Sequence, residues 1–117
     1  MKLTEVKEIL DAEVLTGEEF LDEEATSAFG SDLMSDVLAF VNEGVLLLTG
    51  LVNPQVVRTA EMMDIPAIVF VRGKRPDENT LQLAKSKDMV IMTTENTMYV
   101  ACGKLYSNGL MGEDKGN

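Results

Sequence analysis

The sequence predicts an α/β fold: a single domain of three α/β/α layers, in which helices cover both faces of a mostly parallel central sheet. Three observations lead to this prediction. Residues 45–51, 67–71 and 88–94 form continuous apolar runs of strand length, which is typical of strands buried on both faces. Segments with helical spacing of apolar residues alternate with these runs, as in βαβ units. The chain of 117 residues is long enough to form one core.

The N-terminal part of the chain predicts a helix, a brief strand and an edge strand. The segment LTEVKEIL has a helical apolar stripe, with Thr4 available as its N-cap. This stripe comprises Val6, Ile9 and Leu10. Residues 12–15 favour a strand, and an acidic connection follows in which Phe20 and Leu21 are expected to pack back onto the domain. Residues 25–29 alternate small and polar side chains, which indicates a short or edge strand.

Two helices are expected on either side of the first apolar run. The first covers 31–42, and its apolar stripe comprises Leu33, Met34, Val37, Leu38 and Val41. The second begins at Asn53, an N-cap followed by Pro54 at the first helical position, and ends at residues 64–66. Its buried stripe comprises Val56, Val57, Ala60 and Met63.

The C-terminal part predicts two more helices and a tail. One helix covers 78–87, with Leu81 and Ala84 directed inward. The last helix follows the third apolar run and stops at Asn108-Gly109. Its inner face comprises Met98, Ala101, Cys102 and Leu105. We expect a domain over 1–110 and a flexible tail over 111–117.

Charge argues against several classes of partner. The formal net charge is −10, and residues 1–43 hold twelve acidic side chains against two lysines. Such a surface repels phosphate backbones and anionic lipids, so nucleic-acid and membrane binding are not expected. The chain has no apolar run long enough to cross a bilayer, and its N-terminus is too acidic for a signal peptide, so a cytoplasmic protein is expected.

The residue inventory removes most catalytic chemistry. With no histidine and one cysteine, Cys102, a single copy of the chain can form no zinc site, catalytic triad or intramolecular disulfide. The motifs GxxxxGK[ST], GxGxxG and GxSxG do not occur. No catalytic residue, metal ligand or cofactor is therefore predicted.

The segment AFGSDLMSDVLAFV carries the first candidate site residues. Ser31 or Asp32 is well placed as an N-cap, whereas Ser35 and Asp36 would lie on the solvated face of the following helix. The functional alternative starts from the carboxyl ends of parallel strands, where α/β folds bind their ligands. There the four side chains would offer hydroxyl and carboxylate groups to a ligand or a partner subunit.

Three further segments follow apolar runs and are expected at the same edge of the sheet. Thr49, Gly50 and Asn53 lie between a strand and a helix N-terminus, a junction that can hold an anion. The only basic cluster follows the second run, and it could receive a phosphate or pair with the acidic N-terminal segment of a second subunit. This cluster comprises Arg72, Lys74 and Arg75. Thr94 follows the third run and is most simply the N-cap of the last helix.

The chain resembles the DRTGG domain family over nearly its whole length. The matching landmarks are the Leu15-Thr16-Gly17 turn, Asp22, the Ser31-Asp32 and Ser35-Asp36 steps and the Asn53-Pro54 helix start. Where family members show Asp-Arg and paired glycines, this chain has Asp22-Glu23 and Thr26-Ser27-Ala28. The resemblance implies a fold similar to the N-terminal domain of HPr kinase/phosphorylase and to DRTGG regions of phosphotransacetylases. It also implies a regulatory or ligand-sensing role, with self-association.

Three functions follow as hypotheses. The first is a non-catalytic regulatory or interaction module, a homodimer that binds a small anionic or nucleotide-like ligand. The second is a small enzyme that uses Asp32, Asp36 and Thr49 around a divalent cation, since oxygen ligands suit magnesium and calcium. The third is an accessory subunit of a larger metabolic or redox complex, whose acidic N-terminal part docks on a basic protein partner.

Overall fold

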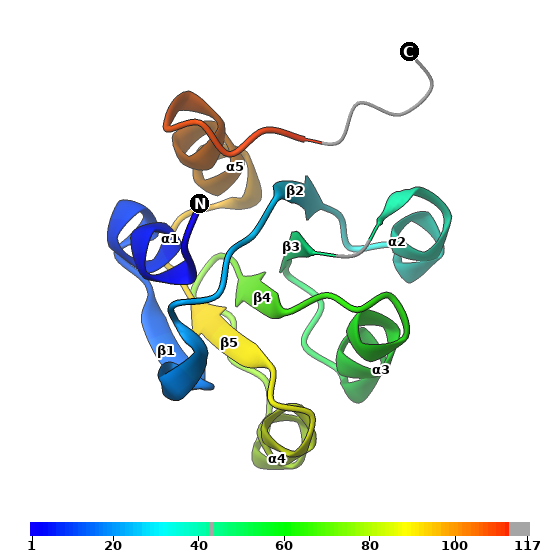
Figure 1. Ribbon diagram of the computed structural model, residues 1–117. Coiled ribbons are helices and arrows are strands. Elements are labelled where there is room, and N and C mark those ends of the chain that lie inside the picture. Colours follow the sequence, from blue (N-terminus) through cyan, green and yellow to red (C-terminus); the bar gives the residue numbers. More distant parts are fainter. Residues whose placement is uncertain (43, 113–117) are drawn as a thin grey trace.

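The computed structural model describes residues 1–42 and 44–112, and these form one α/β unit (Figure 1). The strands are β1 (Glu13–Thr16), β2 (Ser27–Gly30), β3 (Val45–Thr49), β4 (Ala67–Phe70) and β5 (Val90–Thr93). The helices are α1 (Leu3–Leu10), the 3-10 turn η1 (Glu18–Phe20), α2 (Met34–Phe40), α3 (Pro54–Met62), α4 (Glu78–Ser86) and α5 (Met98–Ser107). The predicted α/β class is confirmed.

The sheet is mostly parallel, as expected. Its strand order is β1-β5-β4-β3-β2. Strands β2 to β5 run parallel, and only β1 pairs antiparallel, with β5. The carboxyl ends of β2, β3, β4 and β5 therefore meet at one side of the sheet, which we call the carboxyl edge.

Side chains on the two faces of the sheet form separate cores. Along β3, Leu46 and Leu48 join the core beneath α1 and α5, whereas Val45 and Leu47 join the core beneath α2, α3 and α4. Figure 1 shows the same division, with α1 and α5 on one side of the sheet and the other three helices on the opposite side. This alternation is the period-2 geometry of a strand, and it confirms the three-layer prediction.

Burial follows the apolar runs. Every residue of β3, β4 and β5 is buried, because these strands are covered on both faces. The expected edge strand is β2, and it lies at one margin of the sheet with mixed burial. In the acidic connection, Phe20 and Leu21 pack against the α1–α5 core, as predicted.

Three predicted N-caps are wrong. Helix α1 begins one residue before Thr4, whose hydroxyl donates a hydrogen bond to the carbonyl of Leu21 at 3.0 Å. Helix α2 begins at Met34 with Leu33 in the N-cap position, so neither Ser31 nor Asp32 caps it. The cap of α5 is Thr97, which accepts a bond from the N–H of Val100, and not Thr94. The side chains of Thr4, Asp32 and Thr94 bind partners that are distant in sequence, and Ser31 closes a local turn before the helix. The spacing of residues along the sequence does not reveal such partners.

The apolar stripe predicted for the helix at 31–42 is partly wrong. Val37 and Val41 are buried, but Leu33 is 62% exposed and Leu38 is 44% exposed, because α2 is shorter than expected and covers only the margin of the sheet.

The start of α3 is confirmed: Asn53 occupies the N-cap and Pro54 is the first helical residue, although the Asn53 side chain makes no capping bond.

The end of the described chain folds back on the edge strand. Asn108 is the C-cap of α5, and Gly109 has a φ of 104°, so the predicted stop is confirmed. The carbonyl of Met111 then accepts a hydrogen bond from the N–H of Ala28 in β2 at 3.0 Å. The rest of the expected tail, residues 113–117, lies outside the described residues. Within residues 1–42 and 44–112, none of the helices has the length and apolar character needed to span a membrane.

Candidate functional site

Asp32 links two loops at the carboxyl edge. Its Oδ1 atom accepts hydrogen bonds from the backbone N–H of Gly50 at 2.7 Å and from the hydroxyl of Thr49 at 3.0 Å. The Thr49 hydroxyl also accepts a bond from the N–H of Leu51 at 3.1 Å, and Thr49 is fully buried. The carboxylate therefore holds the turn after β3 against the loop after β2.

The other polar residues of the Ser-Asp steps have local roles. The hydroxyl oxygen of Ser31 accepts a bond from the N–H of Leu33 at 3.0 Å, closing a short turn before α2. Ser35 is exposed, and Asp36 lies in the first turn of α2. The structure thus brings Asp32 together with Thr49 and Gly50, and leaves Ser35 and Asp36 on the helix.

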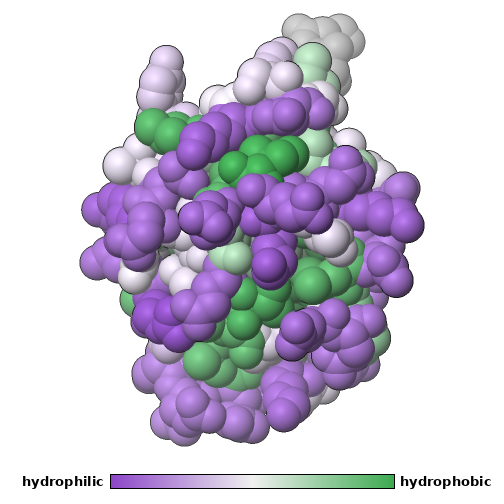
Figure 2. All heavy atoms as spheres, turned by 90° about the vertical axis from the view of Figure 1, so that its left-hand side faces the viewer, coloured by the Kyte–Doolittle hydropathy of each residue, from purple (hydrophilic) through white to green (hydrophobic). Residues whose placement is uncertain are grey.

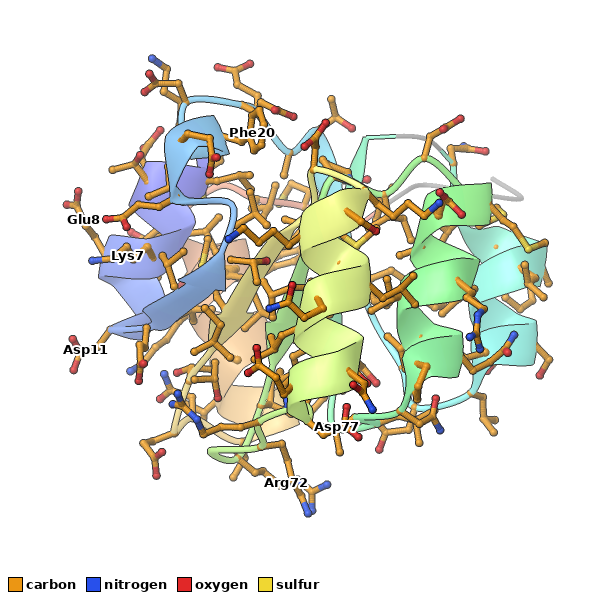
Figure 3. All side chains as sticks on the ribbon, turned by 90° about the horizontal axis from the view of Figure 1, so that it is seen from below. Lys7, Glu8, Asp11, Phe20, Arg72 and Asp77 are labelled. Atoms are coloured by element: carbon orange, nitrogen blue, oxygen red, sulfur yellow. The ribbon has the colours of Figure 1, made fainter. Side chains whose placement is uncertain are left out.

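Arg72 lies against the same turn. Its Nη2 atom is 2.7 Å from the point that a Cβ atom on Gly50 would occupy, so glycine makes room for the guanidinium. The backbone of Arg72 has a φ of 59°, a left-handed conformation that is uncommon for a residue with a side chain. Figure 3 shows the Arg72 side chain projecting away from the domain, at the end of the sheet opposite to Phe20.

The rest of the basic cluster divides into a paired and an unpaired side chain. Arg75 binds Glu13 of β1 through two contacts, Nη1 to Oε1 at 2.9 Å and Nη2 to Oε2 at 3.2 Å. This charge-assisted pair lowers the pKa of Glu13 and raises the pKa of Arg75. Ion pairs in the described part of the chain involve neither Arg72 nor Lys74. Arg72 and Lys74 are therefore the two exposed cations of this loop that lie outside the ion pairs of the described residues.

Thr94 is buried in a hydrogen-bond network that the sequence did not reveal. Its hydroxyl donates to the carbonyl of Leu10 at 2.8 Å and accepts from the side-chain amide of Asn96 at 2.9 Å. The Asn96 amide also donates to Leu10, and its oxygen accepts from the ammonium of Lys104 at 3.1 Å. The network joins α1, α5 and the loop after β5, and the Thr94 side chain is buried within it.

Two further residues complete the edge. The Glu95 carboxylate lies against Gly73, with Oε2 at 2.7 Å from the position of a Cβ atom there, and Gly73 has a φ of 68°. The exposed Asn53 side chain lies at the N-terminus of α3, next to the turn that Arg72 covers. The only sequence signal for Glu95 is its place after a buried strand.

The metal-dependent hypothesis places Asp32, Asp36 and Thr49 around a divalent cation. Across residues 1–42 and 44–112, no group of three or more histidine, cysteine, aspartate or glutamate side chains is placed to hold a metal ion. The Oδ1 atom of Asp32, the central residue of that hypothesis, accepts bonds from Thr49 and Gly50.

The Leu15-Thr16-Gly17 turn has a structural role at the opposite end of the sheet. The Thr16 hydroxyl donates to the carbonyl of Met89 at 2.8 Å, and a Cβ atom on Gly17 would lie 2.8 Å from that oxygen. Beside the turn is a hollow of about 250 Å³, whose lining includes both apolar side chains and the charged residues Glu18, Glu19, Lys85 and Asp88. Figure 2 shows the side of the molecule formed by α1, β1 and α4, where apolar surface lies between hydrophilic side chains.

The fold and the carboxyl edge together define the class of this protein. It is a small three-layer α/β domain whose polar and basic side chains lie where the parallel strands end. The DRTGG domain profile matches residues 5–105. The chain belongs to the DRTGG domain family, so the resemblance noted in the sequence is confirmed. No curated protein matches this chain in sequence.

A solved structure shares the fold. It is the crystal structure of the CBS and DRTGG domains of the regulatory region of Clostridium perfringens pyrophosphatase, complexed with the activator diadenosine tetraphosphate. The TM-score is 0.72 at 18% sequence identity, and the match covers 97% of this chain. The present chain spans about half of that one, 51% of its length.

Proposed function

We propose that this protein is a non-catalytic regulatory module that binds a small anionic, nucleotide-like ligand at the carboxyl edge and associates with itself. The observation that carries the ligand proposal is the guanidinium of Arg72 beside Gly50, at the ends of β3 and β4, which forms no ion pair with any described residue. Arginine suits phosphate groups because its planar donors bind them in pairs.

Three features support a ligand at this edge. Parallel α/β sheets bind ligands outside the carboxyl ends of their strands. The left-handed backbone of Arg72 is strained, and such strain is retained where it places a functional group. The exposed Lys74 lies in the same loop and adds a second cation that has no ion-pair partner within residues 1–42 and 44–112. The regulatory region of the Clostridium perfringens enzyme is complexed with a nucleotide, which makes nucleotides the first ligands to test.

A thermal-shift titration tests the ligand proposal. Nucleotides including diadenosine tetraphosphate, acyl phosphates and inorganic phosphate are added to the purified chain. A ligand present at a hundredfold its dissociation constant should add about 2.7 kcal/mol of stability. Arg72→Ala should abolish the shift, because it removes the paired donors.

Arg58→Ala is the matched control, since Arg58 is an exposed arginine further along α3. It should keep the full ligand-induced shift. If both variants respond as the wild type does, the ligand site is not at the carboxyl edge. If none of these compounds changes the melting temperature, the ligand-sensing proposal fails.

Self-association is tested separately by light scattering across a range of protein concentrations. We expect a dimer, and a monomer at all concentrations would contradict this part of the proposal. The two tests are independent, because the first uses ligand-induced stability and the second uses mass.

A further inference from the structure

The outward face of α5 exposes large apolar and aromatic side chains. Tyr99 is 89% exposed, Tyr106 is 59% exposed and Val100 is 43% exposed. Beside them is an open hollow of about 550 Å³, lined by these residues and by Cys102, Gly103, Lys104 and Ser107. Grouped exposed apolar and aromatic side chains of this kind mark interaction surfaces, whereas single ones are ordinary.

Gly103 gives this face its shape. It lies between Tyr99 and Tyr106 at helical spacing, so the three positions share one stripe. Apart from its two neighbours in sequence and the backbone of its own helix, no described heavy atom lies within 4 Å of the place where its Cβ would be, so packing within the described chain does not require a glycine. Glycine weakens a helix interior relative to alanine. Its presence is explained if another molecule approaches the helix closely here.

Charge favours a second copy of the chain as that molecule. The net charge is −10, so two copies repel each other wherever acidic surfaces meet. Residues 96–112, which contain α5, have no aspartate or glutamate and a single charged side chain, Lys104. The ammonium of Lys104 is bound to Asn96. Two copies can therefore bring their α5 faces together without carboxylate repulsion.

Shape leads to the same partner. A two-fold symmetric interface uses one patch on both subunits, so the patch must be complementary to itself. The α5 face offers the two parts of such a patch, since Tyr99 is 89% exposed and a shallow, open hollow lies along the helix at Gly103. Tyrosine is also among the residues enriched in interfaces and in their most important contacts.

We propose that the protein dimerises through α5, packed against α5 of a second copy around a two-fold axis, with Tyr99 of each copy in the hollow over Gly103 of the other. This inference rests on the self-association proposed above and names its surface.

Two substitutions test the interface by sedimentation velocity. Tyr99→Ala removes the protruding side chain, and Gly103→Gln fills the hollow with a residue that favours helix. Each should raise the dimer dissociation constant at least about tenfold, the effect of losing a central interface contact. Met62→Ala is the matched control, because Met62 is 68% exposed on α3 across the sheet, and it should leave the dimer unchanged.

Tyrosine fluorescence gives a second readout that needs no substitution. The chain has two tyrosines, both on α5, and no tryptophan, so its tyrosine emission reports on this face alone. Quenching by acrylamide should become weaker as the protein concentration rises through the dimer dissociation constant.

The outcomes separate this inference from the proposal on which it rests. A dimer that survives both substitutions, with tyrosines that stay open to quencher, overturns the α5 interface while self-association stands. A protein that stays monomeric up to millimolar concentration overturns both self-association and the α5 interface. Ligand binding by Arg72 is then judged by the thermal-shift titration alone. A dimer weakened by both substitutions and not by Met62→Ala supports the interface.

Discussion

The carboxylate of Asp32 accepts the backbone N–H of Gly50 at 2.7 Å, across 18 residues of sequence. The contact ties the loop after β2 to the turn after β3, on which the guanidinium of Arg72 lies. An aspartate that sequence spacing assigns to a helix cap instead supports the turn beneath the proposed ligand site. Asp32 is therefore a positioning residue, and Arg72 is the group expected to contact the ligand.

Replacing Asp32 should destabilise the fold. Asp32→Ala removes the acceptor of two hydrogen bonds, one of them from the buried Thr49 hydroxyl, so the free energy of unfolding should fall by about 1–3 kcal/mol. Urea denaturation measures the change. Asp36→Ala removes the same charge from α2 and should stay within about 0.5 kcal/mol of the wild type. Equal losses in the two variants would show that net charge, and not the Asp32 contact, is responsible.

Gly17 should not tolerate a side chain. In Gly17→Ala the new Cβ would lie 2.8 Å from the carbonyl oxygen of Met89 and the Cα of Val90, at a φ of 78°. We expect a loss of about 2–4 kcal/mol in unfolding free energy, from the left-handed backbone and the overlap together. Gly109→Ala is the control, because Gly109 also has a positive φ but has open space around it. Gly109→Ala should lose less unfolding free energy than Gly17→Ala. Equal losses would show that the backbone around Gly17 shifts to remove the overlap of the new Cβ with Met89 and Val90.

The Glu13–Arg75 pair should be visible in a titration. The hydrogen bonds and charge of Arg75 hold the pKa of Glu13 below its ordinary value of 4.5. Because the folded pKa is depressed, the pair contributes stability above the unfolded pKa, and this stability is lost as the pH falls through the folded pKa. Both side chains are more than half exposed, so the contribution is small and is weakened by salt.

Carboxyl-carbon NMR of Glu13 measures this pKa directly. Arg75→Gln should return it toward the ordinary value, whereas Arg58→Gln, which changes the same charge on α3, should not. A Glu13 pKa that is insensitive to Arg75→Gln would mean that the pair does not form in solution.

One buried hydroxyl should be dispensable. The Thr59 hydroxyl is buried and has no hydrogen-bond partner in the part of the chain that the structure describes, so Thr59→Val should leave the unfolding free energy unchanged or raise it by up to about 1 kcal/mol. Thr16→Val is the contrast, since the Thr16 hydroxyl donates to Met89 at 2.8 Å, and its removal should cost about 1 kcal/mol. Thermal or urea unfolding compares the two. A clear loss in Thr59→Val would indicate that this hydroxyl has a partner in solution, such as a water.

Much of the fold could be predicted because its signals are local. The apolar runs at 45–51 and 67–71 became β3 and β4, buried at every position. The Asn53-Pro54 step marked the start of α3 for the same reason, since proline at the first helical residue restricts its own backbone. Leu33 and Leu38 were misplaced because the width of a buried stripe depends on how much sheet the helix covers, which periodicity does not contain.

The sequence by itself determined the α/β class, the order of the strands and helices along the chain, and the gathering of polar residues after the strands, because these depend on neighbouring residues and on the geometry of parallel sheets. Only the tertiary structure decided the partners of those residues. It joined Asp32 to Gly50, buried Thr94 against Leu10, paired Arg75 with Glu13 and left Arg72 unpaired among the described residues. A hydrogen bond or ion pair forms between side chains that are close in space, and the packing of the whole chain sets that distance.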